Sequence, residues 1–239
     1  MLIRLAAQLL WPARCAACNA FVPEDWAFCE NCKLSVSELE RVCHGCGLPL
    51  DDGCAEGGRC HGCRVKPLPF SRVWVVLAYG GATTEAILHL KHGGRRHLAR
   101  PLGALLAPAL AAAVNSGVDT LCPVPLHPRR LRQRGFNQAL ELLRAAEKLA
   151  RRPTARPLLV PSGLRRIRDT PALGWESPAS RRRIVAGAFS VDRPEWAQDR
   201  RILLVDDVMT TGATLAACTR VLLKAGAADV QVMALARVG

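Results

Sequence analysis

The chain has 239 residues, half of them apolar, and a formal net charge of +13. This suits one medium-sized domain with a small appendage. No run approaches the roughly 18 consecutive apolar residues of a membrane span, and the N-terminus lacks the small-residue cleavage site of a signal peptide. These features argue against a membrane or exported protein. We expect a cytoplasmic protein whose residues 2–11 form a short helix packed on the adjoining segment.

The charge is unevenly distributed along the chain. Residues 1–65 carry 6 Lys and Arg against 8 Asp and Glu, which leaves 27 against 12 in residues 66–239. A strongly basic region attracts polyanions, either nucleic acid or phosphorylated substrates. An Arg- and Ala-rich chain can also reflect genome base composition, so charge alone does not identify the partner.

Eight cysteines between positions 15 and 63 form four Cys-x-x-Cys pairs. They are Cys15/Cys18, Cys29/Cys32, Cys43/Cys46 and Cys60/Cys63. Two such pairs supply the four thiolates of a tetrahedral zinc site, so the segment predicts two structural zinc ions with no position open for catalysis. A disulfide framework is less compatible with the intracellular composition of the rest of the chain. The repeat favours pairing of consecutive pairs, while a cross-braced arrangement remains open.

Three other cysteines are not expected to bind metal. Cys54 lies in an acidic, Gly-rich loop and is expected to be an exposed bystander, whereas Cys122 and Cys218 lie on apolar stretches and are expected in the core. We place the N-terminal helix and zinc module in residues 1–66 and a second domain in residues 67–239.

The second domain shows alternating strand and helix patterns. The expected elements are a strand at 72–79, helices at 83–91 and 98–114, a strand at 119–126, a basic loop, a helix at 137–150, strands at 156–160 and 200–207, a helix at 213–226 and a strand at 228–238. This order predicts an α/β fold with a mainly parallel sheet and helices on both faces. Ligands of such sheets bind beyond the carboxyl ends of the strands.

The sequence ILLVDDVMTTGATL, residues 202–215, places two acids at such a strand end. Gly212 permits a turn whose backbone N–H groups converge on an anion at the start of a helix, and three threonines add hydroxyl donors. Asp206 and Asp207 would repel a phosphate unless they face sugar hydroxyls or a metal ion. The stretch therefore predicts a site for a phosphorylated sugar. It is neither a Walker A loop nor a dinucleotide-binding motif.

This stretch resembles the phosphoribosyl-pyrophosphate signature of type I phosphoribosyltransferases. Together with CPVPLHPRRLRQRGFNQA (122–139), AYGGATTEAILHLKHGGRR (78–96) and the Cys-x-x-Cys head, it makes nearly the whole chain similar to the ComF/GntX family. Those are competence-associated proteins with a double zinc ribbon and a type I phosphoribosyltransferase-like domain.

The resemblance implies roles for particular residues. Asp206 and Asp207 would be the catalytic acids that hold the ribose 2- and 3-hydroxyls, and Mg²⁺ would bridge the pyrophosphate and the ribose hydroxyls. The 5-phosphate would lie on Val208, Met209, Thr210, Thr211, Gly212, Ala213 and Thr214. The pyrophosphate would be held by Arg129, Arg130, Arg132 and Arg134, with Lys91 reaching it from the Gly-rich loop.

One segment departs from the family pattern. Residues 165–189 keep Thr170, Arg181 and the Gly-Ala-Phe at 187–189, but Leu173 stands where a Gln is expected and Ile184 where an Asn is expected. Because this segment corresponds to the hood over the active site, the acceptor and the transfer reaction are in doubt. The hood is also strongly basic, which suits a polyanion.

Two functions follow from the resemblance. The first is a role in DNA uptake during natural transformation, with phosphoribosyl pyrophosphate and single-stranded DNA as ligands and competence helicases or recombination proteins as possible partners. The alternative is an active phosphoribosyltransferase with an unknown nitrogen acceptor in nucleotide metabolism. Because only Phe136 and Trp175 lie near the basic stretches, DNA binding is expected to be mostly electrostatic.

Overall fold

The structure is a computed structural model that describes residues 12–23, 26–50, 58–92, 94–150, 157–170 and 177–239. The helix expected at 2–11 and the expectations for Cys54, Leu173 and Trp175 lie outside these residues.

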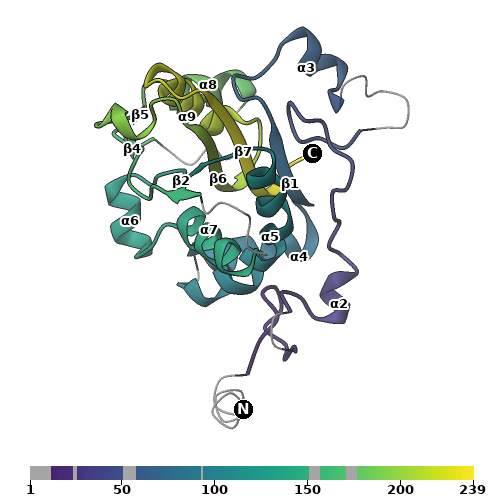
Figure 1. Ribbon diagram of the computed structural model, residues 1–239. Coiled ribbons are helices and arrows are strands. Elements are labelled where there is room, and N and C mark those ends of the chain that lie inside the picture. Colours follow the sequence, from purple (N-terminus) through teal and green to yellow (C-terminus); the bar gives the residue numbers. More distant parts are fainter. Residues whose placement is uncertain (1–11, 24–25, 51–57, 93, 151–156, 171–176) are drawn as a thin grey trace.

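A five-stranded parallel sheet forms the centre of the molecule (Figure 1). Its strands are β1 (Val73–Ala78), β2 (Thr120–Pro123), β3 (Leu158–Leu159), β6 (Arg201–Met209) and β7 (Asp229–Arg237), and their spatial order is β1-β7-β6-β2-β3. This confirms the predicted α/β class. β6 lies in the middle of the sheet, so its carboxyl end opens onto the position where ligands of such sheets bind.

Helices cover both faces of the sheet (Figure 1). On one face lie α4 (Gly81–His92), the 3-10 turn η2 (Arg96–Leu98), α5 (Ala99–Asn115) and α7 (Gln138–Leu149), and on the other lie α8 (Pro178–Val185) and α9 (Ala213–Lys224). Side chains alternate along a strand, so Leu203 and Val205 join the core under α5 and α7, whereas Ile202 and Leu204 join the core under α9. The same alternation directs Asp206 and Asp207 to opposite faces.

The expected basic loop after β2 is wrong in part, because the structure forms a short helix there, α6 (Pro128–Arg134). The ring of His127 accepts a hydrogen bond from the Arg129 N–H, Pro128 occupies the first turn and Gly135 ends the helix with φ of 81°. Proline in the first turn and glycine just past the end are ordinary helix boundary signals.

Four further elements of the sheet domain were not predicted. β4 (Arg165–Arg166) and β5 (Phe189–Ser190) pair antiparallel, α8 lies between them in sequence, and η3 (Pro194–Trp196) follows. Within the main sheet, β6 continues two residues beyond the expected end. Val208 and Met209, expected in the phosphate-binding turn, are therefore strand residues, and Met209 is buried.

The cysteine-rich segment runs along the edge strand β1 (Figure 1). It contains the short helices α2 (Glu30–Lys33) and α3 (His61–Val65). Between its two halves, the Leu39 N–H donates to the Val76 carbonyl at 2.8 Å, and the Ala78 N–H donates to the Ser37 carbonyl at 2.8 Å. These bonds occupy backbone groups of an edge that would otherwise be open to pairing with another chain.

One helical segment in the described part of the chain, Arg96–Asn115, is long and apolar enough to span a membrane by length and composition, with a hydropathy of 1.4. A core helix passes the same test. Leu102, Leu106 and Leu110 of α5 are buried in the core, so we interpret this segment as a core helix.

Candidate functional site

The eight cysteines of the four pairs form two clusters. Within the described residues, Cys15, Cys18, Cys29 and Cys32 make the first and Cys43, Cys46, Cys60 and Cys63 make the second, with all ligand atoms of a cluster within 4.8 Å of one another. The pairing is therefore sequential, which decides the alternative that the sequence left open.

The sulfur spacing fits zinc. Tetrahedral Zn–S bonds of about 2.3 Å place neighbouring sulfurs about 3.8 Å apart. The Sγ atoms of Cys18 and Cys29 are 3.6 Å apart, and those of Cys46 and Cys60 are 3.8 Å apart. Every described cysteine is free of a disulfide. The chain has two four-cysteine zinc sites, and four sulfurs for each metal leave no position for a catalytic water.

Backbone N–H donors lower the pKa of one thiol in each cluster. Burial raises the pKa of Cys43, but N–H groups of Cys60, Gly45 and Cys46 outweigh it and lower the pKa to about 7. In the first cluster, burial is likewise outweighed by backbone donors, including the N–H groups of Cys18 and Cys29, and the pKa of Cys15 falls to about 6. Both shifts favour the thiolate, which is the form that ligates zinc.

The paired acids lie at the carboxyl end of β6, as the sequence predicts. Asp207 is 3 % exposed, and its Oδ2 forms an ion pair with Lys91 Nζ of α4 at 3.0 Å. Asp206 lies on the other face, where its Oδ1 accepts from the Asp207 N–H at 2.9 Å. The charge of Asp207 is thus balanced by Lys91, whereas Asp206 takes part in no ion pair within the described residues.

The pKa of Asp206 is raised by its surroundings. Burial raises the pKa of Asp206 to about 8, the charge of Asp207 acts in the same direction and Lys91 only partly opposes them. Because Lys91 faces Asp207, its pKa is raised despite burial. Near neutral pH the free protein therefore holds a proton on Asp206, and a ligand that needs the carboxylate must displace it.

Asp206→Asn is expected to stabilise the protein at alkaline pH. The folded pKa of about 8 lies above the unfolded value of roughly 3.9, so this group's contribution to stability is full below about pH 4 and is lost as pH rises through the folded pKa. Urea unfolding should give the variant a free energy of unfolding about 1–3 kcal/mol above that of the wild type at pH 9. The difference should be much smaller at pH 5. Asp199→Asn, at an exposed turn, is the control. An equal effect of Asp206→Asn on stability at both pH values would contradict the raised pKa of Asp206.

The turn after β6 leads into α9. Gly212 adopts φ of 75° at the N-cap of α9, a conformation that favours glycine. The first N–H groups of any α-helix lack intrahelical partners and can bind an anion. The hydroxyl of Thr211 is buried and has no hydrogen-bond partner in the structure. A buried hydroxyl left unpaired in this turn is what a phosphate ligand would satisfy.

The four arginines expected around the pyrophosphate lie in different surroundings. Arg134 lies near the acids: burial lowers its pKa, while the charges of Asp207 and Asp206 oppose that shift. Arg130 donates to the Thr170 carbonyl at 2.7 Å, and Arg129 forms an ion pair with Asp169 at 3.4 Å. Both of these side chains contact the hood segment in this structure. Arg132 is exposed.

Arg166 joins the site from the hood, a role that the sequence did not reveal. Its guanidinium donates to the Thr170 hydroxyl, and its Nε is buried without a partner. Burial lowers the pKa of Arg166, and the charge of Asp206 partly opposes that shift. The only sequence signal was the general basic character of the hood. Arg166 lies in β4, where it pairs with Phe189 of β5.

Comparison with known proteins agrees with this architecture. Residues 6–64 match the double zinc ribbon domain family, and residues 174–239 match the phosphoribosyl transferase domain family. The chain is 34% identical to DNA utilization protein YhgH of Escherichia coli O157:H7 over 219 residues, or 89% of this chain and 91% of that protein. It is 28% identical to Competence protein F of Haemophilus influenzae over 94% of this chain and 96% of that protein. It is 24% identical to Competence protein ComFC of Bacillus subtilis over 85% and 81%.

The two four-cysteine sites, the parallel sheet and the acid pair before a glycine-containing turn define a phosphoribosyltransferase-like protein with a double zinc ribbon. Within that class, the chain belongs to the ComF family. This confirms the family resemblance seen in the sequence.

Proposed function

We propose that the carboxyl end of β6 binds phosphoribosyl pyrophosphate with Mg²⁺. The observation that carries the proposal is the buried, unpartnered Thr211 hydroxyl, which lies in the turn that follows the acid pair. The 5-phosphate would occupy the turn from Thr210 to Thr214, with backbone N–H groups and hydroxyls as donors. Val208 and Met209, as strand residues, would contribute only backbone or packing to this site.

The remaining residues of the site would divide the other groups of the ligand. Asp206 would accept from a ribose hydroxyl after losing its proton, and Asp207 would be shared between the second hydroxyl and Lys91. Arg134, Arg166 and Lys91 would balance the charge of the pyrophosphate. With Asp206 and Asp207 as the nearby carboxylates, bound Mg²⁺ would stabilise the charge that develops on the pyrophosphate leaving group. Arg129 and Arg130 would reach the ligand only after leaving Asp169 and Thr170.

Thr211→Val tests this pocket, because it removes the hydroxyl and keeps the shape. Calorimetric titration with phosphoribosyl pyrophosphate and Mg²⁺ should show affinity about 10–100-fold below that of the wild type, which corresponds to the loss of one hydrogen bond to a charged group. Thr219→Val is a matched control, because the Thr219 hydroxyl is also buried without a partner but lies farther along α9. Equal affinity of the wild type and Thr211→Val would remove the phosphate from this turn.

We further propose that the protein takes part in DNA uptake. The support is its similarity to proteins named for DNA utilization and competence, over most of both chains. Competence helicases or recombination proteins are the partners that this role suggests, and a cytoplasmic location is the one it requires. We keep the division into residues 1–66 and 67–239 as part of this proposal.

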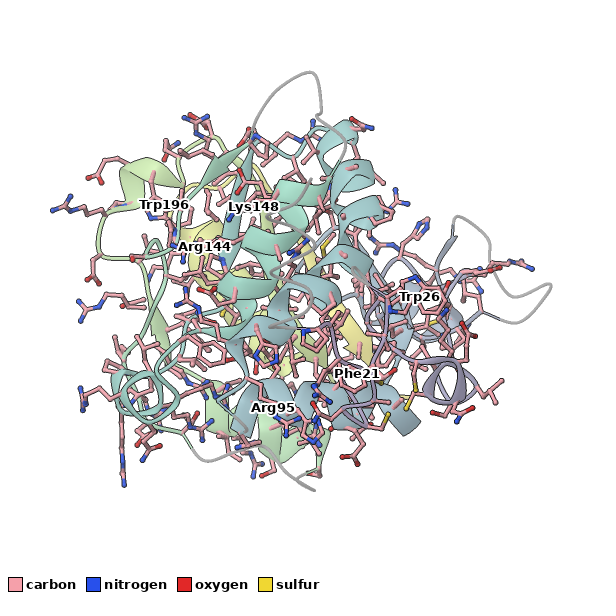
Figure 2. All side chains as sticks on the ribbon, turned by 90° about the horizontal axis from the view of Figure 1, so that it is seen from below. Phe21, Trp26, Arg95, Arg144, Lys148 and Trp196 are labelled. Carbon is pink, nitrogen blue, oxygen red and sulfur yellow. The ribbon has the colours of Figure 1, made fainter. Side chains whose placement is uncertain are left out.

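Single-stranded DNA is the nucleic acid that we propose as ligand. Phe136, which lies near the basic stretches in sequence, is only 7% exposed, which agrees with the expectation that DNA binding is mostly electrostatic. Two other aromatic side chains are accessible on the first ribbon. Arg14 lies over the ring of Phe21 at 4.1 Å and Lys33 lies over the ring of Trp26 at 3.4 Å. Figure 2 shows both aromatics on the face that also carries Arg95, Arg144 and Lys148. Aromatic rings with neighbouring cations suit single-stranded nucleic acid.

The salt dependence of binding tests the DNA proposal. Gel-shift titrations should show binding of single-stranded DNA at low salt, and its affinity should fall about 10-fold or more between 50 and 200 mM salt if several phosphates are neutralised. Phe21→Ala/Trp26→Ala should weaken binding at every salt concentration without changing the slope, whereas Arg144→Ala/Lys148→Ala should reduce the slope. Absence of binding at low salt would end this proposal.

The alternative function is an active phosphoribosyltransferase with an unknown nitrogen acceptor. The observation that favours it is that Arg166 and Thr170 of the hood lie at the site, as a cover for a reaction would require. Release of pyrophosphate in the presence of candidate nitrogen bases would distinguish it from binding alone.

A further inference from the structure

Arg237, the last residue of β7, connects the second zinc site to the end of β6. It is 8% exposed, so its side chain is buried almost completely. Its Nε donates to the carbonyl of Cys46 at 2.7 Å, and its terminal nitrogen donates to the carbonyls of Met209, at 3.4 Å, and Val238. One guanidinium therefore bridges a zinc ligand and the strand residue three positions before Gly212.

The charge of Arg237 matches the zinc site. Four thiolates around Zn²⁺ carry a net charge of about −2, which a buried site must balance. Burial lowers the pKa of Arg237, and the nearby sulfurs of Cys46, Cys63 and Cys43 oppose that shift. Zinc binding keeps these thiolates charged, and their negative charge attracts the Arg237 guanidinium that lies between the ribbon and the sheet.

The other end of this bridge supports the turn after β6. The Met209 carbonyl also accepts from the Val238 N–H at 3.0 Å. A Cβ placed on Gly212 would lie 2.9 Å from the Met209 Cε, with Leu68 and Phe70 at 3.6 and 3.7 Å. Leu68 and Phe70 come directly after the second ribbon in sequence. The turn therefore packs against Met209 and against two residues that follow the second ribbon in the chain.

The first ribbon makes different contacts. Its described polar contacts with the main domain are with α4, where the Ser35 hydroxyl accepts from the Ala82 N–H at 3.1 Å and His89 is 2.9 Å from the Ala16 carbonyl. The two zinc sites have similar chemistry, but they lie against different parts of the domain.

We propose that Arg237 is a positioning residue that makes the phosphate-binding turn depend on the second zinc site and not on the first. This rests on the proposed function of the turn. Loss of the second zinc ion would free the Cys46 carbonyl and leave Arg237 without its counter-charge. The guanidinium would then cease to fix the Met209 carbonyl, and residues 210–214 would no longer hold one conformation for an anion.

Cys60→Ser and Cys29→Ser provide matched variants, since each removes one ligand from one ribbon. Each should retain about one zinc ion per chain, and Cys60→Ser should bind phosphoribosyl pyrophosphate and Mg²⁺ at least 10-fold more weakly, while Cys29→Ser should stay within about 3-fold of wild type. Equal losses in the two variants, or a larger loss in Cys29→Ser, would overturn the proposal.

Arg237 itself is tested with Arg237→Met and Arg237→Lys. Arg237→Met should weaken ligand binding about 10-fold with both zinc ions retained, and Arg237→Lys, which keeps the charge but not the fork of donors, should recover part of it. A lower melting temperature with unchanged affinity would show a purely structural role and would overturn the proposal.

Hydrogen exchange separates failure of this proposal from failure of the proposed function. Without any ligand, amides of residues 211–215 should exchange faster in Cys60→Ser and Arg237→Met than in the wild type or Cys29→Ser. If the wild type binds no phosphoribosyl pyrophosphate, the function is wrong, but this difference in exchange should persist. Unchanged exchange in both variants would overturn the positioning role whatever the ligand.

Discussion

Removal of zinc with a strong chelator is expected to unfold both ribbons and to destabilise the main domain. Structural zinc contributes on the order of 10 kcal/mol per site to folding, and the ribbons have little else to bury. The buried apolar residues of the described ribbon segments are Cys15, Ala16, Ala17, Ala27, Phe28, Cys43 and Cys63. The effect should extend to the sheet, because the segment between the ribbons pairs with edge strand β1.

Metal analysis and limited proteolysis measure this effect. The purified protein should contain two zinc ions per chain, and chelation should open protease sites throughout the ribbons and lower the melting temperature. Added zinc should restore both, whereas added Mg²⁺ should not. A protein that stays protease-resistant and equally stable without zinc would contradict the structural role of the metal.

Asp207→Ala is expected to lower the free energy of unfolding by about 3–5 kcal/mol, because removing one partner of a buried ion pair leaves the other charge uncompensated. The side chains of Lys91 and Asp207 are 23% and 4% exposed, so this ion pair is largely shielded from solvent. Urea unfolding at neutral pH gives the value. Lys91→Met/Asp207→Leu should recover most of the loss, since both charges are then absent.

The surface ion pair between Lys33 and Glu30 provides the control. Its nitrogen–oxygen distance of 3.2 Å is similar, but the two side chains are 44% and 73% exposed. Glu30→Ala should therefore change stability little, because water screens exposed pairs. A small effect of Asp207→Ala, equal to that of Glu30→Ala, would show that Lys91 does not need Asp207.

Elements whose signals lie within a short stretch of sequence are the ones that the sequence predicts. The sequence predicts the five strands of the parallel sheet and the helices α4, α5, α7 and α9 in their order along the chain, with boundaries that differ from the structure by a few residues. The sequence does not predict α6 although His127, Pro128 and Gly135 carry helix boundary signals, because the arginine-rich stretch after Pro128 is interpreted as a basic loop. β4 and β5 were missed because two-residue strands have no periodicity to detect.

The sequence by itself determined that eight cysteines supply two four-cysteine sites and that an acid pair precedes Gly212, because these motifs are short segments with fixed spacing. The tertiary structure decided that consecutive Cys-x-x-Cys pairs share a site. Only the tertiary structure decided which charges meet. It paired Asp207 with Lys91, turned Arg129 and Arg130 toward the hood and placed Arg237 against Cys46, which lies 191 residues away in the chain. Such contacts depend on how helices and strands pack together, and packing is a property of the whole folded chain.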